Sequence, residues 1–322
     1  MSRRNQTIEF FRAIACIFVV LIHARFPEPF GRWIIGAGRF AVPFFCLISG
    51  YFCNRNDTEA SLSHIRIHLK RMVVLTLSAA ALAIVSNFIA GLISGDGCFA
   101  WIAGELRIKV LLRFLLFNRA AFLNSAIWYL FAMIYAYGIL YFLVKTGMVR
   151  YALPFAFVLL TGNLVLCEFS GQAWYYGGNF LLEVLPFVVI GYHFDKFLKV
   201  RIPFACEVFL AFAGCALAVW EVSVFYSYAP LFIGSIVCAV MVFRICLERP
   251  SDRAGVISTF GSKLTMPVYI LHCCVIRIML AIRPELSGTY HYPLLVLLVT
   301  VLLAMLYARY VNGITLSRKP AR

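Results

Sequence analysis

The sequence predicts an all-α integral membrane protein built as a single bundle of about ten transmembrane helices. Of the 322 residues, 63% are hydrophobic and only 13% are charged, which lies outside the range of soluble globular domains. Apolar runs also recur along the whole chain, separated by short polar stretches. A bilayer core takes roughly 20 residues per helix, so ten spans use about 200 residues. The remainder forms short loops and tails and excludes a large soluble domain.

The apolar runs locate the expected helices in order along the chain. The first has a basic head like that of a signal peptide, but Glu9, Arg12 and His23 interrupt it and no cleavage site follows. We therefore expect it to be retained as the first span. Neither a repeat nor a linker is visible, which predicts one domain over residues 1–322. The expected spans lie at residues 8–24, 38–53, 72–94, 125–144, 151–169, 179–195, 204–222, 229–247, 264–282 and 292–311.

The basic residues predict the orientation of the chain. The formal net charge of +15 comes from 29 Lys and Arg against 14 Asp and Glu. With ten spans both termini share one side, and most basic connections fall on that side, including those at Arg4, Arg55, Lys145 and Arg253. Such residues are typical of cytoplasmic loops and meet anionic lipid headgroups. We expect both termini in the cytoplasm, a multi-pass protein of the cell membrane, contact with membrane lipids and no binding of nucleic acid.

The connection before the fourth span departs from this charge pattern. Residues 104–119 should face outward, yet they carry Arg107, Lys109, Arg113 and Arg119. Because their apolar residues recur at helical spacing, we expect an amphipathic helix that lies in the interface or folds into the bundle.

The eleven cysteines predict neither a disulfide framework nor a metal site. Cys16, Cys46, Cys215, Cys238 and Cys273 lie inside apolar runs, where cysteine behaves as a small hydrophobic residue. Their spacing matches no metal-binding pattern, so no metal is expected. The sequence does not indicate an oligomeric state.

The ionisable residues of the first span are the leading site candidates. Arg12 and His23 are eleven residues apart, which places them within roughly 20° of one face and about 16 Å apart along the helix axis. Ionisable groups inside a membrane usually line a cavity or a site. The same spacing also fits a structural alternative, in which Arg12 extends to the inner headgroups and His23 lies at the outer interface.

Ser49, Trp128 and Tyr129 are weaker candidates for substrate contact. Ser49 and Gly50 are small, so their alternative role is to let the second helix approach the first closely. Trp128 and Tyr129 stand at the end of a span, where an aromatic belt at the membrane interface is the ordinary interpretation.

Glu183, Tyr269 and His272 complete the set of possible substrate contacts. Glu183 lies several residues into an apolar run, so it either pairs with a cation or orients a catalytic group. Tyr269 and His272 are three residues apart on one helical face. They either make hydrogen bonds between helices or contact the acceptor.

Several blocks resemble one family of membrane proteins. Arg12, ten residues and His23, followed by "FFCLISGYF" at 44–52, resemble the acyltransferase-3 family of membrane acyltransferases. Further blocks agree in order: "HLKRM" at 68–72, "AIWYLFAMIYAY" at 126–137, "VLPFVVIGYHFDK" at 184–196 and "GSKLTMPVYILH" at 261–272. Two departures concern the basic block, where Lys70 replaces a common arginine and no proline follows Arg71.

The resemblance implies acyl transfer, commonly from acetyl-CoA to a hydroxyl of a glycan or another polar acceptor. Acetyl-CoA would be the co-substrate, with its phosphates held by Arg12, Lys70 and Arg71 near the cytoplasm. Its pantetheine arm would reach about 16 Å along the first helix and deliver the thioester to His23. There His23 would act as general base, with a covalent acetyl-imidazole as the variant mechanism. Arg12 and His23 are thus the expected catalytic residues.

Other functions remain open at this point. A transporter or permease for a small polar solute also needs polar groups facing a cavity. Internal inverted repeats would favour a carrier, and none is visible. An uptake module for amino acids or polyols is a third possibility. The sequence identifies neither the acceptor nor the acyl group.

Overall fold

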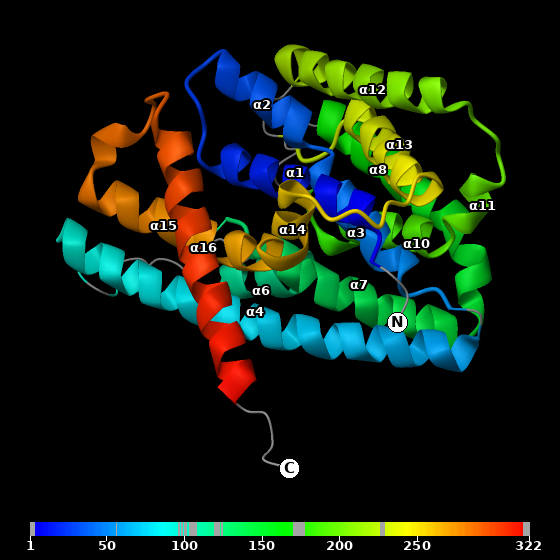
Figure 1. Ribbon diagram of the computed structural model, residues 1–322, viewed down its shortest axis with the longest axis horizontal. Coiled ribbons are helices and arrows are strands. Elements are labelled where there is room, and N and C mark those ends of the chain that lie inside the picture. The colour runs from blue at the N-terminus through cyan, green and yellow to red at the C-terminus, as the bar shows by residue number, and fades with distance from the viewer. Residues whose placement is uncertain are drawn as a thin grey trace.

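The computed structural model describes residues 4–55, 57–95, 97, 99, 102, 108–118, 123, 125–169, 178–225 and 229–317. These residues form helices and connecting turns, with no strand among them. The helices pack into one bundle, with the long helix α4 along one side (Figure 1). They are α1 (Gln6–His23), α2 (Phe30–Gly38), α3 (Ala41–Tyr51), α4 (Thr58–Ser94), α6 (Ile108–Phe117), α7 (Trp128–Lys145), α8 (Ala152–Phe169), α10 (Leu185–Tyr192), α11 (Asp195–Leu198), α12 (Phe204–Val224), α13 (Ile233–Glu248), α14 (Val256–Lys263), α15 (Thr265–Ile282) and α16 (Tyr292–Ser317), with short helical turns η1 (Met148–Tyr151), η2 (Phe180–Val184) and η3 (Pro284–Leu286).

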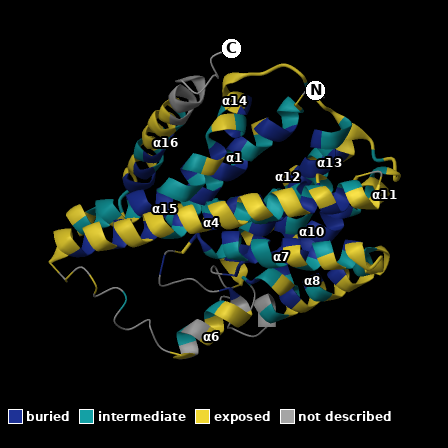
Figure 2. Cartoon of the chain, turned by 90° about the horizontal axis from the view of Figure 1, so that it is seen from below, coloured by how far each residue is buried: buried dark blue, intermediate teal, exposed yellow. Residues whose placement is uncertain are grey.

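Each predicted apolar run contains a helix, and the fold is that of an all-α integral membrane protein. Among the described residues, eight helical segments are long and apolar enough to cross a bilayer. The segment Phe180–Tyr192 and helix α13 are shorter. Large apolar side chains such as Val74, Leu77 and Leu306 are exposed on the outward faces of α4 and α16, and exposed residues follow those faces in Figure 2. Such surfaces suit lipid rather than water.

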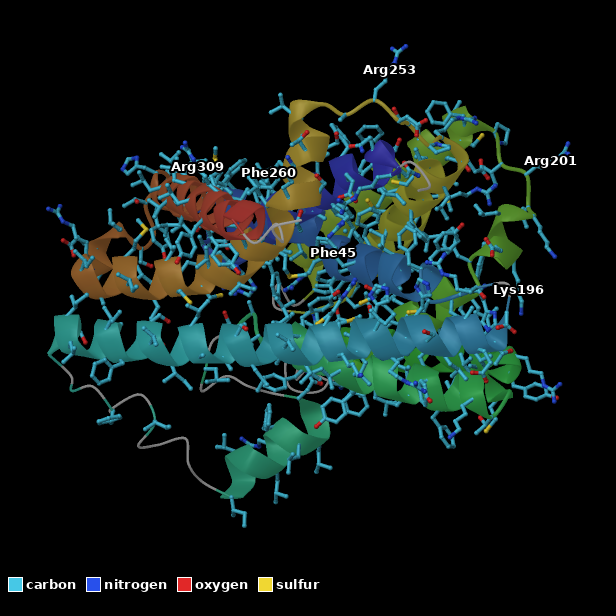
Figure 3. The ribbon with its side chains drawn as sticks, turned by 60° about the horizontal axis from the view of Figure 1, so that its bottom comes forward. Phe45, Lys196, Arg201, Arg253, Phe260 and Arg309 are labelled. Carbon is cyan, nitrogen blue, oxygen red and sulfur yellow. The ribbon has the colours of Figure 1, made fainter. Side chains whose placement is uncertain are left out.

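Side-chain hydrogen bonds tie several connections together at one end of the bundle. Asn5 donates to the carbonyl of Cys246, Thr7 donates to that of Arg249, and the backbone N–H of Gln6 donates to that of Ser251. We call this the N-terminal end. The basic residues Lys196, Arg201 and Arg253 project away from the body of the protein (Figure 3). The chain therefore returns repeatedly to this end, as the predicted alternation of spans requires.

A close helix crossing fixes the position of α3. An added Cβ at Gly50 would lie 1.9 Å from the carbonyl oxygen of Val188, and one at Gly191 would lie 2.3 Å from that of Leu47. Only residues without a side chain allow the backbones of α3 and α10 to meet so closely. The expected close approach of Gly50 to the first helix is wrong, because its partner is α10; which helix a small residue meets is decided by tertiary packing.

Helices α14 and α15 bring the C-terminal half of the chain against α1. Gly261 packs on the backbone of Glu9, and the Cys16 thiol donates to the carbonyl of Thr265. The chain turns at Leu264, after which α15 runs past the C-terminal half of α1 and packs on α4 and α16. This path carries Tyr269 and His272 to the end of α1.

The predicted amphipathic segment is helical where the structure describes it. Helix α6 covers Ile108–Phe117, whereas residues 104–107 and 119, with Arg107 and Arg119, lie outside the described residues. The ring of Phe114 packs edge-on against Phe131 at 4.7 Å between centroids, and Tyr135 donates to the carbonyl of Leu115. These contacts hold α6 against α7, at the margin of the bundle (Figure 2).

Candidate active site

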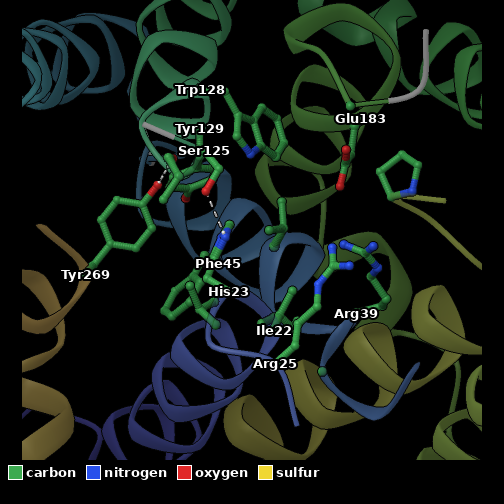
Figure 4. A pocket seen from close by; sticks show the side chains of 17 residues that line it. Ile22, His23, Arg25, Arg39, Phe45, Ser125, Trp128, Tyr129, Glu183 and Tyr269 are labelled. Atoms are coloured by element: carbon green, nitrogen blue, oxygen red, sulfur yellow. Dashed lines mark hydrogen bonds between the residues drawn. The ribbon is translucent and has the colours of Figure 1, made fainter. Parts of the chain in front are cut away.

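A cavity of about 420 Å³ opens at the end of α1 opposite the N-terminal end. Five of the residues predicted from the sequence line it together: His23, Trp128, Tyr129, Glu183 and Tyr269. They come from four helical segments that are far apart in the sequence (Figure 4). The remaining lining residues are Val19, Ile22, Arg25, Gly38, Arg39, Ala41, Val42, Phe45, Ser125, Ala126, Gly178 and Pro230.

His23 is the last residue of α1 and is partly buried. Its Nδ1 lies 3.1 Å from the hydroxyl oxygen of Ser125, in the turn before α7. Its ring centroid is 5.2 Å from that of His272 on α15. His272, the remaining predicted contact on α15, therefore lies next to His23 but does not itself line the cavity.

A chain of hydrogen bonds runs from His23 to the backbone of α15. The Ser125 oxygen lies 3.8 Å from the Cys273 sulfur, which lies 3.3 Å from Nε2 of His272. Nδ1 of His272 donates to the carbonyl of Tyr269 at 2.7 Å. These contacts join α1, the turn before α7 and α15 at one point.

The carbonyl at the end of this chain sets the direction of the bond from His272, and one arrangement of protons then satisfies every other contact. A carbonyl oxygen can only accept, so neutral His272 carries its proton on Nδ1 and accepts at Nε2. The Cys273 thiol then donates to His272, the Ser125 hydroxyl donates to Cys273, and His23 donates from Nδ1 to Ser125. In this arrangement Nε2 of His23 keeps its lone pair and is the basic nitrogen.

The aromatic residues are held by backbone contacts. The Tyr269 hydroxyl donates to the carbonyl of Ala126 at 2.5 Å, so it makes the hydrogen bond between segments that was one of its two expected roles. It also lines the cavity, and its ring centroid lies 5.9 Å from that of Tyr129. Asn118 donates to the carbonyl of Trp128 and accepts from the N–H of Phe180. Asn118 therefore joins the start of α7 to the segment that carries Glu183.

Glu183 enters the cavity from the irregular turn η2. Asn179 caps this turn by accepting from the N–H groups of Leu181 and Leu182, and Pro186, which has no N–H, follows. Such π-type turns are frequent at functional sites. Glu183 is only 1% exposed, and its Oε2 has no hydrogen-bond partner. An unpaired buried carboxylate oxygen that faces a cavity is available to a ligand.

The sequence interpretation missed Arg25 and Arg39, which line the same cavity. Arg25 follows α1 and is exposed, whereas Arg39 lies between α2 and α3 and is half-buried. Figure 4 shows both guanidinium groups, together with Glu183, among the side chains that line the cavity. In the sequence they look like ordinary basic residues at the ends of spans. Ser125 and Asn118 were missed as well, because single polar residues in a turn carry no pattern.

Arg12 lies on the same unbroken helix as His23 but does not line the cavity. Its guanidinium bonds both carboxylate oxygens of Glu9, at 3.2 and 3.1 Å. Arg4 bonds the same carboxylate at 2.7 Å. Two guanidinium groups on one carboxylate leave a net positive charge near the N-terminal end. Arg12 and His23 are then about 16 Å apart along the axis, at opposite ends of α1.

Lys70, Arg71 and Ser49 also lie outside the cavity lining. Lys70 and Arg71 line a second, mostly apolar groove formed by α4, α15 and α16. Helix α15 lies between the two spaces, because Tyr269 faces the cavity and Ile270 faces the groove. The Ser49 hydroxyl bonds the carbonyl of Phe45 in its own helix. Lys70 and Arg71 are therefore separated from His23, whereas Ser49 lies outside the lining but within hydrogen-bond reach of Tyr129, which lines the cavity.

The donor atoms of His23, His272 and Cys273 lie within 4.8 Å of one another. Two imidazoles and a thiolate are ligands that Zn²⁺ accepts. The sequence pattern gave no sign of this cluster, since His23 is far from His272 along the chain. Each of these side chains also takes part in the hydrogen-bond chain described above.

The fold and the cavity define a polytopic helical membrane protein with a polar internal site that contains a histidine. The family model described as "Acyltransferase domain" matches residues 5–309 of the 322-residue chain. The protein therefore belongs to the acyltransferase-3 family, as the order of its sequence blocks predicted, and is a membrane acyltransferase. No curated protein and no solved structure matches the chain.

Proposed function

We propose that the protein transfers an acetyl or similar acyl group from acyl-CoA to a hydroxyl of a surface-glycan precursor or another polar acceptor. The observation that carries the proposal is His23, which lines the cavity with a hydrogen-bonded Nδ1 and a basic Nε2. A cavity of this size, with aromatic walls and a few polar groups, is typical of a site for a small polar ligand.

His23 acts as general base in the proposed reaction. The acceptor oxygen attacks the thioester carbonyl carbon while Nε2 takes the hydroxyl proton. The C–S bond then breaks, and the CoA sulfur leaves with the proton carried by the imidazolium. In this reaction Ser125, 3.1 Å from Nδ1, accepts the Nδ1 proton throughout, which keeps the imidazole in one orientation and favours its charged form during the transfer.

Donor and acceptor reach His23 from opposite ends of the bundle in this proposal. The net positive charge around Arg4, Glu9 and Arg12 and the pair Lys70 and Arg71 attract the phosphates of CoA. These residues belong to the half of the molecule that is predicted to face the cytoplasm. The acceptor occupies the cavity at the other end, against Trp128, Tyr129, Glu183 and Tyr269.

The test compares purified His23→Ala with the parent protein in lipid nanodiscs. The assay measures CoA release from acetyl-CoA and ester formation on extracted surface glycan. Loss of a general base should reduce turnover by about 10²–10⁴-fold, with an unchanged unfolding midpoint. His291→Ala, an exposed histidine near the start of α16, is the matched control and should retain activity.

Near-parental turnover in the His23→Ala variant would overturn the assignment. The carrier alternative makes a different prediction for the same two proteins. A permease would take up a small solute into proteoliposomes without CoA, and it would not release CoA thiol in either variant.

A further inference from the structure

We propose that Arg25 and Arg39 form a subsite for an anionic group on the acceptor, and that Glu183 binds hydroxyls of the same molecule. The acceptor class is then a sugar acid or a sugar phosphate rather than a neutral sugar. This inference rests on the proposed acyl transfer, because it names the substrate that enters the His23 cavity.

The first support is the position of the two arginines. They come from different connections, one after α1 and one between α2 and α3, yet both line the cavity that His23 lines. Figure 4 draws both guanidinium groups among the side chains that line the cavity. Guanidinium groups bind carboxylates and phosphates through paired, planar hydrogen bonds.

The second support is the balance of charge inside the cavity. Among the described residues that line it, Arg25, Arg39 and Glu183 carry formal charges. Two guanidinium groups outweigh one carboxylate, so the described part of the lining is positive whether or not Glu183 is ionised. A carboxylate or phosphate on a ligand complements this positive charge.

The third support is the unpaired oxygen of Glu183, which is 1% exposed and faces the cavity. A carboxylate oxygen accepts hydrogen bonds, so it suits the hydroxyls of a ligand and not its acidic group. Trp128, Tyr129 and Phe45 supply flat apolar walls. A ring that bears several hydroxyls and one carboxylate or phosphate satisfies all of these groups together.

The subsite is distinct from the proposed donor site. Arg25 and Arg39 adjoin the His23 end of α1, whereas Arg12 lies about 16 Å nearer the N-terminal end along the axis. When an anion is bound at the subsite, Arg12, Lys70 and Arg71 are therefore still available to bind the phosphates of CoA. It also places the acidic group beside His23, with the hydroxyls of the same ring within the cavity.

The experiment uses three sugars that differ in one group: glucose, glucuronate and glucose 1-phosphate. Binding to the full-length protein in nanodiscs is followed by the shift in unfolding midpoint during titration. We expect the parent to bind one or both anionic sugars more tightly than glucose. Arg25→Gln and Arg39→Gln should each weaken that preference by about tenfold or more, since each removes a charged hydrogen-bond donor. The comparison of glucuronate with glucose 1-phosphate distinguishes a carboxylate from a phosphate.

Arg32→Gln is the matched control, because Arg32 lies in the same region, pairs with Glu28 and does not line the cavity. It should bind the sugars as the parent does, and Arg39→Lys, which keeps the charge, should retain more of the preference than Arg39→Gln. Equal binding of all three sugars by the parent would overturn the proposal. The proposal would also be overturned if Arg32→Gln lost the preference for anionic sugars as fully as the two cavity variants do.

Binding of CoA is measured on the same proteins. The subsite predicts that Arg25→Gln and Arg39→Gln bind CoA as the parent does. If they lose CoA binding and not sugar binding, the arginines hold the donor and the subsite proposal is wrong. If the parent binds anionic sugars but no CoA, the proposed acyl transfer fails while the anion subsite stands.

Discussion

Two of the regions in which the structure buries charged side chains differ in what the unpaired oxygen of a carboxylate faces. Glu207 and Glu183 each have one buried oxygen without a hydrogen-bond partner, and of the two only Glu183 lines the cavity. Arg244 on α13 is 2% exposed and donates to Glu207, Glu248 and the carbonyls of Phe197 and Val200. Glu183 is 1% exposed, but one of its oxygens has no partner and faces the cavity. A charge whose hydrogen bonds are used by the protein holds the fold together, and one with unused capacity beside a cavity is available to a ligand.

The difference is invisible in the sequence, where both residues are single charges in apolar runs. Arg244 joins α13 to α12 and to the connection around α11, and thus closes the N-terminal end. Glu183 is held by capping of its backbone turn, which leaves the carboxylate itself free of protein contacts at Oε2. Substitutions in the two regions should therefore affect different properties.

Arg244→Ala should cause the largest loss of stability. Removal of one partner from a buried ion pair costs about 3–5 kcal/mol, because the other charge stays buried and unpaired. The unfolding midpoint of the purified protein would measure it. Arg249→Ala, whose exposed guanidinium lies over the Phe204 ring at 5.0 Å, is the control and should cost less than about 1 kcal/mol. Equal losses of stability in both variants would contradict the claim that the buried contacts of Arg244 hold the fold together.

Glu183→Gln is the counterpart in the cavity. The change keeps the shape of the side chain and removes a buried ionisable group, so the unfolding midpoint should be unchanged or higher. Turnover should fall about tenfold, because an oxygen that accepts hydrogen bonds is replaced by an NH₂ group that can only donate them. A large drop in the unfolding midpoint with normal turnover would show that Glu183 is a structural partner like Arg244.

Arg12→Lys should be damaging even though the charge is kept. Arg12 bonds Glu9 through one terminal nitrogen at 3.1 and 3.2 Å, which leaves the rest of its planar group for a phosphate. An ammonium replaces such a fork poorly. We expect acetyl-CoA binding and turnover to fall about tenfold. Normal acetyl-CoA binding in the Lys variant would instead support the structural alternative, in which Arg12 extends to the inner headgroups.

Ser125→Ala and His272→Asn should have smaller effects that are confined to kcat. Each breaks the hydrogen-bond chain that keeps His23 protonated on Nδ1, so a smaller fraction of the enzyme presents a basic Nε2. We expect kcat to fall several-fold, to about a tenth at most, with KM for acetyl-CoA unchanged. A change in KM alone would show that these residues contact the donor instead.

Much of the fold was predictable, because apolar length is a strong signal in a membrane protein. Every predicted apolar run contains a helix, and residues 108–117 are helical as expected. The partner of Gly50 was wrong, since a small residue indicates close packing but not the helix it meets. The short segment around Glu183 forms a π-type turn with an Asn179 cap, which hydropathy does not show.

The site was predictable in part for a similar reason. His23, Glu183 and the aromatic residues stood out because ionisable groups and span ends are conspicuous in apolar runs. Arg25 and Arg39 did not, because basic residues at the ends of spans are expected for orientation alone. Their place beside His23 depends on how α2 packs against α1 and α12. The separation of Lys70 and Arg71 from the cavity by α15 likewise follows from packing.

The most direct test of the account is the side from which each substrate reaches His23. Sealed vesicles would be prepared with the N-terminus outward, verified by protease removal of an N-terminal tag, and loaded with a sugar acceptor that is turned over in the CoA-release assay. Labelled acetyl-CoA supplied only outside should then acylate the enclosed acceptor, and His23→Ala should abolish the label. Acylation only of acceptor on the same side as acetyl-CoA, or equal rates with donor on either side, would contradict transfer across the bundle.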